Sequence, residues 1–165
     1  MDLRRIATHV LTSDRHVRRT SPQGALDAIE RAITASETIH AGQIRFVIEG
    51  ALDGLPLLRG QTARARAIEL FSQLGVWDTA HNNGVLVYVL LADRAVEIVV
   101  DRGLQAPVGD TAWIGICQAM QTAFAGGAFE AGAVGGVRAV TDQLALHFPA
   151  GGPRPNELPD TPLML

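Results

Sequence analysis

Two apolar runs separated by three residues constrain this chain more than any other feature of its sequence. Residues 84–91 (GVLVYVLL) and 95–101 (AVEIVVD) both have strand composition, and only Ala92, Asp93 and Arg94 join them. A link this short cannot carry a crossover, so the two strands must form an antiparallel hairpin. The first strand is apolar on both faces, which is typical of a central strand covered by helices on both sides.

The rest of the chain alternates between helical and strand patterns. Residues 43–49 (QIRFVIE) predict a first strand, with Ile44, Phe46 and Ile48 on one face. Thr62 is placed as a helix N-cap, Gly75 as its left-handed C-terminal residue, and Asp110 as the cap of a later helix. Helices are predicted at 22–39, at 62–75, from Asp110 to about 125, and at 128–147.

This order of elements predicts an α/β fold, a three-layer α/β/α sandwich with a small mixed sheet, a central antiparallel hairpin and about four helices. Three strands are predicted, and a short fourth strand at 104–108 is left open. Residues 21–148 form the domain in this interpretation. Residues 149–165 contain five of the eight prolines and no periodicity, so a flexible tail is expected there.

Residues 1–20 form a basic N-terminal arm with five arginines. Its apolar residues Leu3, Ile6, Val10 and Leu11 lie close to helical spacing. We expect the arm to pack on its own domain; the alternative is contact with an acidic partner or an anionic membrane surface.

Composition excludes several classes of function. The chain has no lysine, which rules out a Walker A loop and Schiff-base chemistry. A net charge of -3 argues against nucleic-acid binding, and the single cysteine, Cys117, excludes an internal disulfide and a cysteine zinc site. No apolar run is long enough to span a membrane and no secretory signal pattern is present, so a cytoplasmic location is expected.

The hairpin brings polar residues from two loops to one end of the sheet. Asn82 and Asn83 enter the first strand where Asp101 and Arg102 leave the second, with Asp78 slightly upstream. Carboxylate and amide oxygens suit a hard divalent cation, calcium or magnesium, and the guanidinium suits a phosphate. The predicted metal ligands are Asp78, Asn82, Asn83 and Asp101, and the predicted catalytic residues are Asp78, Asp101 and Arg102. The alternative is that these residues form turns, caps and an internal ion pair.

Two further residues stay open at this level. Glu49 joins the Asp101 cluster if its strand runs parallel to residues 95–101, and lies near Asp93 if it runs parallel to residues 84–91. His81 adjoins the cluster and could act as an acid, base or ligand, but an exposed loop histidine without a role is the favoured interpretation.

Several of these motifs together resemble the TPM-domain family, which is sometimes labelled a phosphatase family. The matching features are a Leu74-Gly75 turn, the run Asn82-Asn83-Gly84-Val85-Leu86, the Asp93-Arg94 turn, Gly103-Leu104 and the phrase GGAFEAGAVGGVRAV. The resemblance extends over about 22–148. It departs at Asp101-Arg102-Gly103, where many relatives have Gly-Tyr-Gly, and at Trp77-Asp78, where glycine is common.

The resemblance implies a compact α/β/α sandwich. Acid phosphatase activity and calcium binding are attributed to some members of the family, and others resemble accessory or assembly factors. We therefore expect an accessory or interaction domain with a weak divalent-metal or anion site at residues 78–83 and 101–103, and with a protein partner at or near a membrane. The alternative is a metal-assisted acid phosphatase acting on phosphomonoesters.

Overall fold

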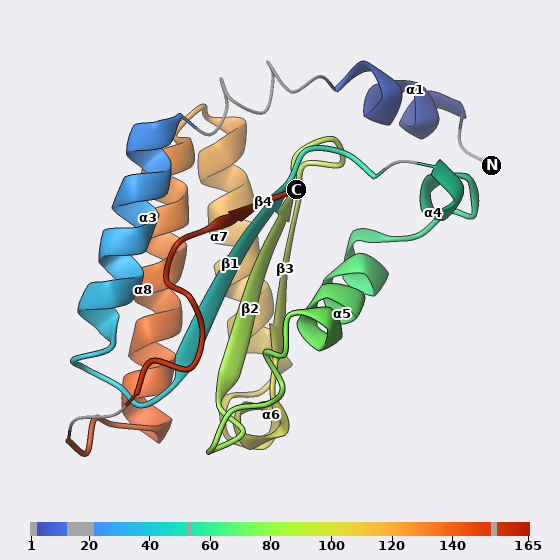
Figure 1. The fold of residues 1–165 in the computed structure, drawn as a ribbon. Helices are drawn as coiled ribbons and strands as arrows, with labels where there is room; N and C mark the ends of the chain where they lie inside the picture. The colour runs from blue at the N-terminus through green and yellow to red at the C-terminus, as the bar shows by residue number, and fades with distance from the viewer. Residues whose placement is uncertain (1–2, 13–21, 53, 153–154) are drawn as a thin grey trace.

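A computed structural model describes residues 3–12, 22–52, 54–152 and 155–165. Figure 1 shows a sheet with helices on both faces. The helices are α1 (Leu3–Leu11), α3 (Gln23–Ser36), α4 (Gly54–Leu58), α5 (Ala63–Gln73), α6 (Arg102–Val108), α7 (Asp110–Ala125) and α8 (Phe129–His147). The strands are β1 (Gln43–Glu49), β2 (Gly84–Leu90), β3 (Ala95–Val100) and β4 (Leu163–Met164).

The described strands form one mixed sheet in the order β3-β2-β1-β4. β2 and β3 pair antiparallel, with Val85 opposite Val100, which confirms the predicted hairpin. β1 runs parallel to β2, with Glu49 in register with Leu90. The open question about Glu49 is thereby answered: it lies at the Asp93 end of the sheet, away from Asp101.

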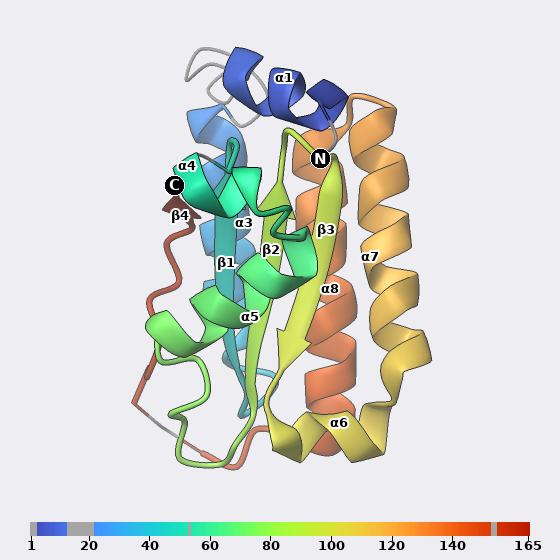
Figure 2. The ribbon, with the colours of Figure 1, turned by 90° about the vertical axis from the view of Figure 1, so that its right-hand side faces the viewer.

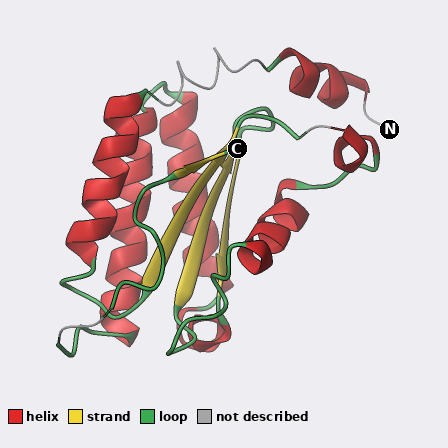
Figure 3. Ribbon diagram, viewed as in Figure 1, coloured by secondary structure: helices red, strands yellow, loops and turns green. Residues whose placement is uncertain are grey.

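The sheet separates two apolar cores, as the two-sided pattern of β2 predicts. One face, with Ile44, Phe46 and Ile48, packs against α3, α7 and α8. The other face, with Val47, Leu86 and Tyr88, is covered by α5 and by the segment around α4. Figure 2 looks onto this second face and Figure 3 shows the three layers edge-on, so the predicted α/β/α sandwich is confirmed.

Local signals placed most helix boundaries correctly. Thr62 caps α5, since its hydroxyl accepts a hydrogen bond from the N–H of Ala65 at 3.1 Å. Gly75 has φ of +66°, which a glycine adopts without strain. α3 ends at Ser36, three residues before the predicted end.

The structure differs from the sequence interpretation at three elements. Residues 104–108 form part of α6 and not a fourth strand; Asp101 caps that helix, and Leu104 turns into the core. Asp110 is the first residue of α7, with Gly109 at the cap position and no side-chain cap bond. A short helix, α4, lies between the first strand and Thr62, where the sequence interpretation places no helix.

The described part of the C-terminal segment packs against the domain. Residues 155–165 run along the edge of β1 (Figure 1), where β4 pairs with Val47 and Ile48. Arg45 donates hydrogen bonds to the carbonyls of Pro159 and Thr161, at 3.0 and 2.5 Å, and Leu158 is buried. The tail therefore completes the sheet and covers its β1 edge.

Within the described residues, no helix has the length and apolarity needed to cross a membrane.

Candidate functional site

The hairpin brings the loop before β2 into direct contact with the residues after β3. The N–H of Asp101 donates to the carbonyl of Gly84 at 2.9 Å, and the N–H of Gly103 donates to the carbonyl of Asn82 at 3.0 Å. Nε of Arg102 donates to Oδ1 of Asn82 at 3.1 Å. Asn82, Asn83, Asp101 and Arg102 therefore share one end of the sheet, as the hairpin argument predicted. This end lies beside α6, at the bottom of Figure 1.

Asp101 is the buried carboxylate of this cluster, with only 7% of its surface exposed. Its Oδ1 accepts a hydrogen bond from the N–H of Arg102 at 2.7 Å. Its Oδ2 is buried and has no hydrogen-bond partner among the described residues. A buried carboxylate oxygen without a donor costs about 1–3 kcal/mol or more, because it has lost water and gained nothing in exchange. A bound cation is one means of compensating that cost.

Asn83 is fully buried and lies on the other side of β2 from Asp101. Its Nδ2 donates to the carbonyl of Ala41, just before β1, at 2.9 Å, and its N–H donates to Oγ1 of Thr79. Its Oδ1 is also buried and without a hydrogen-bond partner in the described structure. Asn83 thus fixes the loop to β1, whereas Asp101 belongs to the β3 side of the hairpin.

The remaining loop residues face solvent. The N–H of Asp78 bonds the carbonyl of Gly75 in the turn after α5, and the residue is exposed. His81 is exposed, in agreement with the favoured interpretation of that residue. Trp77 donates from Nε1 to the carbonyl of Ser72 at 3.3 Å and is 54% exposed. No group of three or more His, Cys, Asp or Glu side chains in the described ranges is arranged to hold a metal ion.

Two glycines of the cluster are explained by close backbone approach. A Cβ on Gly84 would lie 2.0 Å from the carbonyl oxygen of Val76, and one on Gly103 would lie 2.4 Å from that of Asn82. Both contacts involve backbone atoms, which cannot move away cheaply. The tight packing of the two loops therefore requires these glycines.

The opposite end of the sheet holds a second polar cluster that the sequence did not predict. Asp93, in the β2–β3 turn, accepts hydrogen bonds from Arg5 at 3.0 and 2.7 Å and one from Nε2 of His9 at 2.8 Å. Nδ1 of His9 accepts from the N–H of Leu52 at 2.8 Å, so Nε2 carries the proton. These contacts join α1 to the domain. The sequence signal was the helical spacing in the arm, which does not specify a partner.

A buried network lies beneath α5 on the same side of the sheet. Glu49 accepts two hydrogen bonds from Arg66, at 3.0 and 2.9 Å, and one from the hydroxyl of Tyr88 at 2.6 Å. Burial and the hydrogen bond to Glu49 raise the pKa of Tyr88, so the phenol stays protonated. Because every partner is a protein group, this network is structural.

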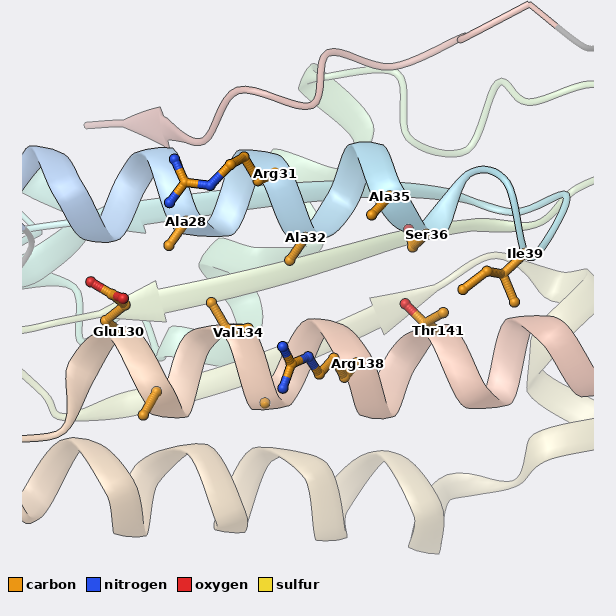
Figure 4. Close-up of a pocket in the computed structure, with 12 residues that line it drawn as sticks. Ala28, Arg31, Ala32, Ala35, Ser36, Ile39, Glu130, Val134, Arg138 and Thr141 are labelled. Carbon is orange, nitrogen blue, oxygen red and sulfur yellow. The ribbon is translucent and has the colours of Figure 1, made fainter.

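A groove of about 630 Å³ runs between α3 and α8 on the outer face of the helical layer. Figure 4 shows Arg31 on one wall and Glu130 and Arg138 on the other, with small side chains such as Ala32 between them. Gly132 and Gly136 of α8 instead contact α7, where a Cβ would meet Phe124 and Met120. These two glycines therefore allow α8 to pack closely against α7.

Comparison with known proteins agrees with the fold. The model of the TPM domain matches residues 21–143. The NMR structure of the BA42 protein from the psychrophilic bacterium Bizionia argentinensis is similar, with a TM-score of 0.72, 30% sequence identity, and coverage of 86% of this chain and 92% of that one. The N-terminal domain of a protein from P. gingivalis shares the fold, with a TM-score of 0.61, 22% identity, and coverage of 79% and 82%. No curated protein matches the sequence. The extent of the family match and the likeness to BA42 lead to one conclusion: this chain belongs to the TPM-domain family.

Proposed function

We propose that this TPM domain is an accessory or interaction module that binds a divalent cation, calcium or magnesium, weakly at the end of the sheet formed by residues 78–83 and 101–103. The observation that carries the proposal is the buried Oδ2 of Asp101, which has no hydrogen-bond partner among the described residues. A cation would coordinate this oxygen and compensate the negative charge of the carboxylate.

The remaining ligands in this proposal come from the loop before β2. Asn82 offers its amide oxygen once Arg102 turns away, and Asp78, which is exposed, approaches from solvent. Asn83, the fourth ligand expected from the sequence, acts mainly by holding the loop to β1 through Ala41. With one buried carboxylate and water completing the coordination, we expect a dissociation constant on the order of 10⁻⁴ to 10⁻³ M.

The exposed guanidinium of Arg102 favours a second candidate function, metal-assisted hydrolysis of phosphomonoesters. A bound cation would supply polarisation of a phosphoryl oxygen. In this scheme Arg102 binds the phosphate oxygens in a bidentate manner, while Asp101 and Asp78 hold the cation. The binding module ranks first because Asp101 is the only carboxylate of the predicted site residues that is buried, and it already caps α6.

Calcium titration of matched variants tests the proposal. Asp101→Asn keeps the cap, since asparagine is as good an N-cap as aspartate, but removes the charge. Asp110→Asn changes an exposed carboxylate outside the cluster and serves as the control. We expect calorimetry to detect binding by the wild type and by Asp110→Asn, and none by Asp101→Asn. Equal binding by all three proteins would refute the assignment.

A generic phosphomonoesterase assay separates binding from turnover. If the domain is a binding module, we expect no hydrolysis of p-nitrophenyl phosphate in the presence of calcium or magnesium. Hydrolysis that is lost in both Asp101→Asn and Arg102→Gln would instead establish the second candidate.

The proposal also includes a protein partner and a cytoplasmic location. The free thiol of Cys117 is compatible with a reducing compartment. Affinity capture with the intact domain, compared with Asp101→Asn, tests whether partner binding depends on the cation site.

A further inference from the structure

α1 presents an unusually apolar face to solvent. Leu3, Val10 and Leu11 are 69%, 73% and 79% exposed. They are spaced i, i+7 and i+8 along the helix, with exposed Ala7 between them, so they form one continuous stripe. Three large apolar side chains on nine residues are more than an ordinary soluble surface carries at one place.

The opposite face of the same helix is fixed to the domain. Arg5 and His9 bond Asp93, His9 also accepts from Leu52, and Ile6 packs against the core on the α5 side of the sheet. The apolar stripe is therefore held outward by specific contacts and does not belong to a fraying end. Figures 1 and 2 both show α1 at the end of the molecule far from α6, and Figure 1 shows it on the same side of the sheet as α4 and α5.

Charge separates the arm from the rest of the chain. The sequence of residues 1–20 contains five arginines and two aspartates, a formal charge of +3, whereas the whole chain carries -3. Residues 21–165 therefore carry -6. An acidic body would be repelled by an anionic surface, but its basic arm would be attracted and would orient the molecule with α1 foremost.

We infer that α1 docks the domain onto an anionic lipid surface, with Leu3, Val10 and Leu11 inserted at the boundary between headgroups and acyl chains. Apolar residues on one face combined with arginine are the features of a helix that lies in the membrane interface. The formal charge of +3 on residues 1–20 supplies the attraction to lipid phosphates. An acidic protein surface would be attracted by the same positive charges, but its binding would not require three adjacent, exposed apolar side chains.

This docking is independent of the proposed cation site. α1 and the loops around Asp101 lie at opposite ends of the sheet (Figure 1), so a membrane-bound domain would keep residues 78–83 and 101–103 facing away from the lipid. Loss of membrane docking should leave cation binding intact, and the reverse also holds. The vesicle experiment and the calcium titration can therefore fail independently of each other.

Vesicle co-sedimentation of the full chain tests the inference. We expect binding to vesicles that contain phosphatidylglycerol, little binding to vesicles of phosphatidylcholine alone, and a decrease as salt is raised. The double variant Val10→Ser/Leu11→Ser should reduce the bound fraction at least about fivefold, because it removes two of the three inserting side chains. Leu146→Ser is the matched control, since Leu146 is 72% exposed and lies near the end of α8, away from α1.

Circular dichroism and thermal unfolding establish that both variants fold, because all three substituted side chains are exposed. Failure of the wild type to bind phosphatidylglycerol vesicles would overturn the inference. So would equal binding by the double variant and the Leu146→Ser control, or capture of an acidic peptide that is lost in the double variant without any lipid binding.

Discussion

Nε2 of His9 donates a hydrogen bond of 2.8 Å to Oδ1 of Asp93, which joins the first helix of the chain to the turn of the central hairpin. The His9 side chain is fully buried, and the same aspartate binds Arg5. Removing the carboxylate leaves the buried Nε2 of His9 without its acceptor, while Arg5 loses its ion pair and keeps its hydrogen bond of 2.7 Å to the carbonyl of Gln61.

Asp93→Ala should therefore destabilise the protein by about 2 kcal/mol and release α1. Hydrogen exchange in residues 3–11 should accelerate, while exchange in β2 stays slow. Asp142→Ala, which alters an exposed aspartate on α8, is the control and should change neither quantity. Unchanged protection of α1 in Asp93→Ala would show that other contacts hold the helix.

The contribution of Asp93 should depend on pH. Burial raises the pKa of Asp93, but the hydrogen bonds from Arg5 and His9 outweigh burial and hold the pKa below its usual value. A carboxyl group whose pKa is lower in the folded state than in the unfolded state stabilises the protein at pH values above the unfolded-state pKa. This stabilisation is lost as the pH falls through the folded-state pKa. In urea unfolding, the difference in the free energy of unfolding between wild type and Asp93→Ala should become smaller below about pH 4. A constant difference from pH 7 to pH 3 would contradict this.

Gly84→Ala should be severely destabilising, by about 3 kcal/mol, since its Cβ would lie 2.0 Å from the carbonyl oxygen of Val76. Gly135→Ala is the matched control. Gly135 lies within α8 and a Cβ there meets nothing within 4 Å, so alanine should stabilise the helix by about 0.5–1 kcal/mol. Chemical denaturation of both variants measures these changes. Comparable stability of the two variants would mean that the backbone at Val76 moves away from the added Cβ at little cost in free energy.

Tyr88→Phe and Arg66→Leu should differ in cost although both remove a hydrogen bond to Glu49. Tyr88→Phe leaves the two bonds from Arg66 in place and should cost about 1 kcal/mol. Arg66→Leu leaves a buried carboxylate without its counter-charge and should cost about 3 kcal/mol. Equilibrium unfolding at pH 7 gives both values, and a larger loss in Tyr88→Phe would reverse the assigned roles.

Leu158→Ala should destabilise the protein by about 2 kcal/mol, since Leu158 is buried in the core on the α5 side of the sheet. Leu165→Ala removes a leucine that is 47% exposed and should cost less than about 0.5 kcal/mol. Thermal unfolding compares the two. If they are equal, the C-terminal segment does not contribute to the core.

Local patterns were sufficient to predict the hairpin and most helix boundaries. The three-residue link at Ala92–Arg94 left one topology, and Thr62 and Gly75 carry cap signals that depend only on neighbouring residues. Glu49 could not be placed because its position depends on which strand β1 pairs with, and its partner in β2, Leu90, is 41 residues away in sequence (90 − 49).

Contacts distant in sequence also explain the predictions that failed. The proline content of the tail gives no sign of the contacts by which Arg45 donates to the carbonyls of Pro159 and Thr161. Residues 104–108 were left open as a short strand, yet Asp101 caps a helix there. For the candidate site, the hairpin predicted that Asn82, Asp101 and Arg102 meet; the hydrogen bonding of each side chain depends on loop geometry that the sequence does not specify.

The most direct test of the cation site is a calcium titration followed by two-dimensional ¹⁵N NMR of the wild-type domain. The account predicts saturable shifts in the backbone signals of Asp101, Arg102 and residues 79–83, with no shifts at the Asp93 end of the sheet. Signals that stay unmoved at residues 79–83 and 101–103, or that move equally at Asp93, would contradict it.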